Sequence, residues 1–174
     1  IILEDMRLGG PQKQIIYFLQ ECIKTKTNNQ YLLLVPRFSK NKLSKFLNIK
    51  KLEVKEIDIQ YLSKYSVIKY LKFFYKDFRQ LKNSLKNIKK VYIAGGSSNL
   101  KSLILSIMLK KEIYFHVHDT RSNIILKMSL FFISFFVKKI FFKSKSSQGY
   151  YSYLSNNPKK IILRSSINPF YFKN

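Results

Sequence analysis

The sequence Glu-Ile-Tyr-Phe-His-Val-His-Asp-Thr-Arg at positions 112–121 decides the fold. Residues 113–117 are largely apolar and β-prone, and the polar residues 118–121 follow them without a break. Such a run is typical of a parallel strand that is buried on both faces. Ligands of open α/β sheets bind outside the carboxyl ends of the strands. We therefore place the centre of a candidate site at His118 and Asp119.

Strand patterns alternate with helix patterns on both sides of this stretch. Strands are predicted at residues 1–3, 31–35, 52–57, 91–94, 113–117, 140–142 and 159–163, and helices at 11–24, 41–47, 67–85, 100–109, 124–137 and 146–154. Residues 52–57 alternate apolar with charged side chains, which indicates an edge strand with one wet face. The pattern predicts one α/β domain over residues 1–174, with a doubly wound, mostly parallel, Rossmann-like sheet of about seven strands.

The segment 124–137 is apolar nearly all round. It is shorter than the roughly 20 residues that span a bilayer. We expect a buried helix here, and shallow insertion into a membrane surface is the alternative.

The chain is strongly basic, with 33 Lys and Arg residues against 9 Asp and Glu and a net charge of +24. Residues 120–174 contain ten basic residues and no acid, so this third is the expected contact face. Charge of this size attracts polyanions and anionic lipid, although a solvated lysine-rich surface explains it equally well. Only five of the basic residues are arginine, the side chain on which nucleic-acid recognition relies, so we expect no specific nucleic-acid partner. The single cysteine, Cys22, indicates a reducing, cytoplasmic compartment.

Two glycine-bearing turns follow predicted strands. Gly9-Gly10 precedes the first helix, and Gly96-Ser97 precedes the helix at 100–109, which Ser97 or Ser98 could cap. Backbone N–H groups at such turns can hold an anion, but glycines can also serve a tight turn alone. The right-handed crossover rule places the first, fourth and fifth strand ends along one rim.

The two histidines are expected to differ in role. His118 could donate a hydrogen bond to a sugar hydroxyl or stabilise positive charge, with Asp119 ordering it or accepting from a hydroxyl. His116 should point to the same face of the sheet, and we expect it to be a hydrogen-bonded core residue. The histidines have no third clustered ligand beyond Asp119, so no metal is expected. No Walker-type phosphate loop and no full dinucleotide fingerprint is present.

Several segments resemble a known family. Residues 4–12, Glu-Asp-Met-Arg-Leu-Gly-Gly-Pro-Gln, resemble a glycine-rich loop that closes over a donor's phosphate and sugar. Residues 115–119 resemble a strand-ending His-Asp, 140–146 a strand-then-serine step, and 161–172 a segment that leads into a second domain. Together they resemble the N-terminal domain of a GT-B glycosyltransferase of family 4. The last segment departs from the family pattern, with Ser165-Ser166 in place of Asn-Gly and Asn168 in place of Asp.

This resemblance implies an acceptor-side N-terminal half whose C-terminal nucleotide-sugar domain is absent from the sequence, so the fragment alone is expected to be inactive. It implies His118 and Asp119 as catalytic residues, and Gly9, Gly10 and Gln12 as the donor-phosphate loop. The implied acceptor-side or rim residues are Arg7, Gly96, Ser97, Arg121 and Ser144.

The implied reaction is a retaining transfer from a nucleotide-sugar to a lipid-linked or polysaccharide acceptor in cell-envelope glycan synthesis. The nucleotide-sugar is a co-substrate, and neither a metal nor a tightly bound cofactor is expected. The implied location is cytoplasmic, with peripheral attachment to the inner face of the cell membrane. Two alternatives stay open: a non-catalytic basic α/β module that binds nucleic acid or another polyanion, and a nucleotide-dependent enzyme that is complete in itself.

Overall fold

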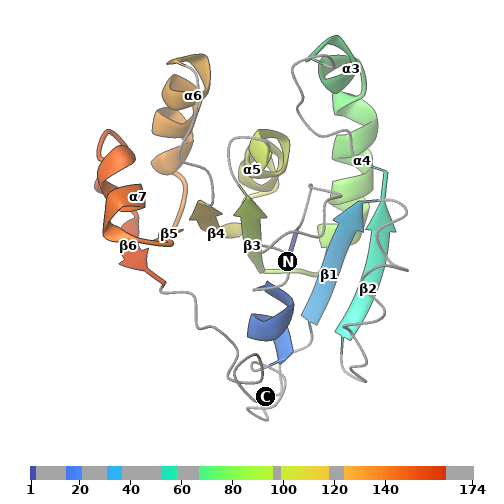
Figure 1. Cartoon of the computed structure of the whole chain (residues 1–174). Coiled ribbons are helices and arrows are strands. Elements are labelled where there is room, and N and C mark those ends of the chain that lie inside the picture. The colour runs from blue at the N-terminus through green and yellow to red at the C-terminus, as the bar shows by residue number, and fades with distance from the viewer. Residues whose placement is uncertain are drawn as a thin grey trace, which may run out of the picture.

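A computed structural model describes residues 1–2, 15–20, 31–36, 52–58, 67–95, 99–117 and 124–163. The elements, in chain order, are β1 (Tyr31–Pro36), β2 (Leu52–Ile57), α3 (Val67–Lys72), α4 (Phe74–Leu85), β3 (Lys90–Gly95), α5 (Leu100–Met108), β4 (Glu112–Val117), α6 (Ile124–Ser134), β5 (Lys139–Phe142), α7 (Lys145–Tyr150) and β6 (Lys159–Ile162) (Figure 1). A helical segment at residues 15–20 precedes β1. It lies inside the predicted helix at 11–24, whereas the predicted helix at 41–47 lies outside the described residues.

All the strand pairs of the described chain are parallel. β1 pairs with β2, and β3, β4, β5 and β6 pair in that order. Ile2 joins the two groups, because it forms parallel bridges to Leu34 of β1 and to Ile93 of β3. Its amide donates to the Tyr92 carbonyl at 2.9 Å, and its carbonyl accepts from the Ala94 amide at 3.3 Å. The order across the described sheet is therefore β2, β1, Ile2, β3, β4, β5, β6. Ile2 belongs to the predicted first strand at residues 1–3, whose last residue lies outside the described residues.

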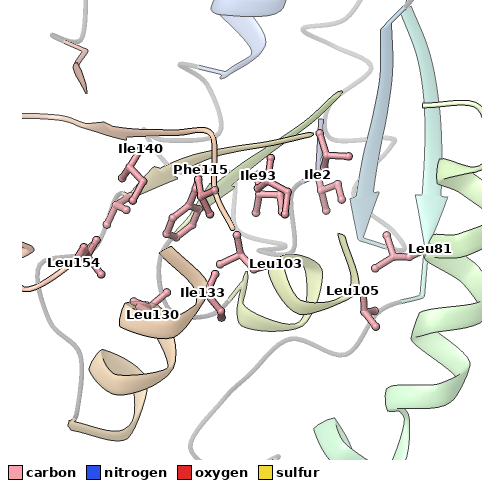
Figure 2. Close-up of a cluster of buried hydrophobic side chains, with 14 of the residues drawn as sticks. Ile2, Leu81, Ile93, Leu103, Leu105, Phe115, Leu130, Ile133, Ile140 and Leu154 are labelled. Carbon is pink, nitrogen blue, oxygen red and sulfur yellow. The ribbon is translucent and has the colours of Figure 1, made fainter. Parts of the chain in front are cut away.

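Both faces of the sheet carry helices, which confirms the doubly wound architecture. One face packs against α4, α5, α6 and α7; in Figure 2, Ile93, Phe115 and Ile140 of the strands meet Leu103 of α5 and Ile133 of α6. Along the strands, the residues that alternate with Ile93, Phe115 and Ile140 point toward the second face of the sheet. The larger buried side chains on that second face are Ile15, Ile16, Leu19, Leu33 and Val35.

The predicted helix at 67–85 is interrupted. Phe73, with φ −90° and ψ 7°, separates α3 from α4. The predicted edge strand is confirmed: Glu53, Lys55 and Glu56 of β2 are exposed, whereas Ile57 is buried.

The expectation of a fully buried helix at 124–137 is wrong. Leu130, Ile133 and Val137 face the core, but Ile124 and Ile125 are each 70% exposed. A helix that is apolar all round is buried only if neighbours cover both sides, and here the sheet covers one. Within the described segments, no helix has both the length and the apolar character that crossing a membrane requires.

Candidate functional site

The carboxyl ends of the strands lie along one edge of the sheet. Gly95 of β3 is in register with Val117 of β4, Val117 with Phe142 of β5, and Phe142 with Ile162 of β6. Ile2 lies on the other side of β3. The predicted adjacency of the first, fourth and fifth strands is therefore confirmed for Ile2, β3 and β4, whereas the end of the first strand lies outside the described residues. The strand order reverses between Ile2 and β3, and such a switch point is where open α/β sheets bind ligands.

Most of the predicted site residues follow these strand ends in sequence but lie outside the described residues. His118 and Asp119 come directly after Val117, and Gly96 and Ser97 come directly after Gly95. The remaining residues outside the described segments are Arg7, Gly9, Gly10, Gln12 and Arg121. The roles assigned to all of them stay predictions.

The end of β3 requires a glycine. Gly95 has φ 154°, and a Cβ there would come within 2.1 Å of Asn99 Nδ2. The buried Asn99 side chain donates to the Ala94 carbonyl at 2.6 Å, so it occupies the space beside the glycine. Asn99, rather than Ser97 or Ser98, is the N-cap residue of α5, and it makes no side-chain capping bond. The backbone conformation of Gly95 and the position of Asn99 therefore require a glycine at this position.

His116 is a buried histidine, as predicted. The residue is 6% exposed, and its Nδ1 shares a 2.6 Å hydrogen bond with the Tyr92 hydroxyl. Phe141 presents its ring to the imidazole at a centroid distance of 6.2 Å. Burial, assisted by the positive charge of Lys143, lowers the His116 pKa from 6.5 to about 4. The ring is therefore neutral at physiological pH.

A basic hollow lies at the carboxyl ends of β5 and β6. It has a volume of about 600 Å³, and its described lining is Lys143, Ser144, Lys145, Ile162 and Leu163. Ser144 Oγ accepts a 3.1 Å hydrogen bond from the Ser147 amide and caps α7. The predicted rim residue Ser144 thus lies at the expected edge of the sheet. The two lysines were not predicted as site residues, although a Lys-Ser-Lys run directly after an apolar strand could have indicated them.

A second hollow, of about 520 Å³, lies beside α4 and the outermost strand, β2. Its lining mixes charges, including Lys55, Glu56 and Asp58. Asp58 pairs with Lys76 at 2.8 Å, and its amide donates to Gln80 Oε1 at 3.1 Å. β1 and Ile2 separate this hollow from the switch point, so we centre the candidate site on β3 to β6. Among the residues that the structure describes, no group of three His, Cys, Asp or Glu side chains could hold a metal.

Comparison with known proteins identifies the fold. No family model matches the chain, and no curated protein sequence matches it. Similar solved structures include HepE from Anabaena in complex with UDP and glucose, with a TM-score of 0.72 and 11% identity over 99% of this chain and 45% of HepE. HepE in complex with UDP-glucose gives a TM-score of 0.67 at 12% identity, over 99% of this chain and 45% of HepE. MurG from Acinetobacter baumannii gives a TM-score of 0.61 at 14% identity, over 98% of this chain and 47% of MurG.

The chain thus spans less than half the length of the proteins that it resembles. Its parallel α/β fold resembles the N-terminal half of GT-B glycosyltransferases, which confirms the predicted fold class. The assignment to family 4 stays a prediction.

Proposed function

We propose that this chain is the acceptor-side half of a glycosyltransferase. The full protein would move a sugar from a nucleotide-sugar to a lipid-linked or polysaccharide acceptor in cell-envelope glycan synthesis, at the inner face of the cell membrane. The observation that carries the proposal is the end-to-end likeness of this fold to HepE, a protein solved with UDP-glucose. The basic character of the switch-point edge supports it further.

In this proposal His118 and Asp119, at the end of β4, act on the transferred sugar. His118 donates a hydrogen bond to a sugar hydroxyl or stabilises the positive charge that develops during transfer, while Asp119 orders the imidazole. The loop with Gly9, Gly10 and Gln12 closes over the donor phosphates, for which backbone N–H groups are suitable donors. The reaction uses no metal and no tightly bound cofactor.

The remaining predicted residues, Arg7, Gly96, Ser97, Arg121 and Ser144, form the acceptor side and the rim. Lys143 and Lys145 lie at the same edge as Ser144. Their positive charge favours a negatively charged substrate by Coulomb attraction. This half alone is expected to be inactive, because the nucleotide is held by the other half.

The test is nucleotide-sugar turnover by the full-length protein. We expect release of the donor's nucleoside diphosphate, which is UDP for UDP-glucose, when a nucleotide-sugar and a lipid-linked oligosaccharide are both present. We expect His118→Ala to lower kcat by about 100-fold or more, the usual magnitude for a positioned acid–base or hydrogen-bonding group. The matched control is Asp58→Asn at the far edge of the sheet, which should leave kcat unchanged.

The proposal fails if no nucleotide-sugar is turned over, or if His118→Ala retains full activity. A basic nucleic-acid-binding module would behave differently. It would bind oligonucleotides with an affinity that falls steeply as salt rises, and it would release no UDP.

A further inference from the structure

Helix α6 exposes a continuous apolar surface on the side away from the sheet. Its exposed residues, with those of the following turn, are Ile124, Ile125, Met128, Phe132, Phe135 and Phe136, which we call the α6 strip. They are between 46% and 70% exposed. Monomeric soluble proteins rarely show contiguous apolar patches of this kind unless the patch contacts a partner or a membrane.

The strip follows from the helical repeat of the sequence. At about 100° per residue, the strip residues lie along one side of the helix, roughly opposite Leu130 and Ile133. Figure 2 shows Leu130 and Ile133 directed toward the side of Phe115 and Leu103, which are part of the same buried cluster. Phe131 borders the strip and packs against it, because its ring contacts Phe132 at a centroid distance of 5.5 Å and Phe135 at 5.2 Å.

The part of the chain that contains the strip is positively charged. Residues 124–163 include seven lysines and no Asp or Glu. Beside the strip, Lys127 Nζ lies 4.8 Å from the centre of the Tyr150 ring and 5.8 Å from that of Tyr153. A binding partner of this surface should therefore have both an apolar region and negative charge.

An anionic bilayer meets both requirements. Amphipathic helices with aromatic and aliphatic residues on one face and lysines at the margins bury the apolar face at the boundary of headgroups and acyl chains. Anionic headgroups attract the neighbouring lysines. A second copy of this chain would offer an apolar face but would also bring another +24 of charge. A nucleic acid would offer the negative charge but no apolar phase.

We propose that the α6 strip inserts into the surface of an anionic membrane, with α6 lying in the plane of the interface. α6 has 11 residues, a length suited to lying at the interface rather than spanning the bilayer. In sequence, the strip begins at Ile124, shortly after β4 ends at Val117. This inference deepens the membrane location given in the proposed function, but it does not rest on glycosyl transfer, so vesicle binding and sugar transfer can fail separately.

The chain contains no tryptophan, so one introduced indole reports a single position. The full chain with Phe132→Trp is mixed with vesicles of phosphatidylcholine and phosphatidylglycerol. We expect the emission to move to shorter wavelength and to be quenched by brominated acyl chains. The matched control is Phe18→Trp in the helical segment at residues 15–20, on the other face of the sheet, where the native side chain is 49% exposed; its emission should not shift when vesicles are added.

Vesicle sedimentation measures the affinity. Phe132→Ser combined with Phe136→Ser should lower the partition coefficient at least about tenfold, because each buried phenylalanine contributes the equivalent of about one power of ten. Phe18→Ser combined with Met108→Ser, also exposed residues and both outside α6, should change it less than about twofold. Circular dichroism of both double variants should match that of the parent.

Several results would overturn the inference. One is that the protein binds vesicles while the indole at position 132 keeps the emission of a water-exposed group. Another is that the double variant at Phe132 and Phe136 binds vesicles as tightly as the parent. Equal binding to vesicles of phosphatidylcholine alone would remove the role of anionic lipid. A dimer in gel filtration that Phe132→Ser and Phe136→Ser dissociate would identify a second copy as the occupant.

Discussion

Gly95 illustrates how one residue sets the local geometry of the site. It ends β3 immediately before the predicted glycine turn, with φ 154° and the Asn99 amide group in the space that a Cβ would need. Gly149, inside α7, is the contrasting case, because an added Cβ there meets no heavy atom within 4 Å.

We predict that Gly95→Ala lowers the free energy of unfolding by about 1–3 kcal/mol, because it combines a disfavoured φ with a steric clash. Gly149→Ala should raise it by about 0.5–1 kcal/mol, since alanine is the better helix former. Urea unfolding of the two variants measures both values. Equal changes in the free energy of unfolding at the two positions would contradict the conclusion that position 95 requires a glycine and position 149 does not.

His116 is the residue whose titration should be visible in the stability of the protein. Its pKa is lowered from 6.5 to about 4 by burial and then by Lys143. Between those pH values the unfolded chain binds a proton at this position that the folded chain does not. The free energy of unfolding therefore falls as pH decreases from 6.5 to about 4, and above 6.5 this group contributes no further pH dependence.

We expect the His116 contribution to this fall to be about 2–3 kcal/mol. The difference in stability between the parent and His116→Gln, followed from pH 6.5 to 4, isolates it from the carboxylates that also titrate. The chain has two histidines, so an NMR titration of His118→Asn observes His116 alone. A pKa near the ordinary value would contradict the burial argument.

At the scale of elements, a buried ion pair joins α4 to α5. Lys101 Nζ lies 2.5 Å from Asp77 Oδ2, and both side chains are 0% exposed. An ion pair nearby, Lys76 with Asp58, links α4 to the end of β2 at 2.8 Å but is 49% and 39% exposed. The two pairs share the same chemistry and differ in their access to water.

Lys101→Met should lower the free energy of unfolding by about 3–5 kcal/mol, because it leaves the Asp77 carboxylate buried without its cation. Lys76→Met, the matched control, should cost about 0–1 kcal/mol, since water solvates Asp58 after the change. Adding Asp77→Leu to Lys101→Met should recover much of the loss. Similar costs for the two single variants, in urea unfolding, would show that burial does not distinguish them.

For the whole molecule, Ile2 is the described residue that bridges the two strand groups of the sheet. It is 0% exposed and bridges β1 and β3, which are far apart in sequence. The switch point, and with it the candidate site, depends on this junction.

Ile2→Ala should cost about 2–5 kcal/mol, as buried isoleucine truncations do. It should also speed amide hydrogen exchange in β1 and β2 more than in β4 to β6, because it loosens the edge group from the rest. The matched control is Leu103→Ala in α5, also 0% exposed, whose effect should fall on β3 and β4 instead. Uniform acceleration in both variants would mean that the sheet opens as one unit.

The candidate site was predictable as a place but not as a set of contacts. Strand order follows from alternation and the crossover rule, so the edge that contains the ends of β3 and β4 could be named in advance. The contacts at that edge arise between residues distant in sequence, such as Tyr92 with His116. Lys143 and Lys145 of the basic hollow were missed as well, although they follow the apolar strand β5 directly in sequence.

The sequence by itself determined where the strands and helices lie, that the sheet is parallel and doubly wound, and that His116 belongs to the core. Those features depend on the spacing of apolar residues along a single segment. Only the tertiary structure decided that one side of α6 is exposed, that Lys101 is buried against Asp77, and that Asn99 closes over Gly95. Burial depends on which distant segments pack together. The sequence of an apolar helix does not show which of its sides is covered, and the sequence around a lysine does not show whether the lysine is buried.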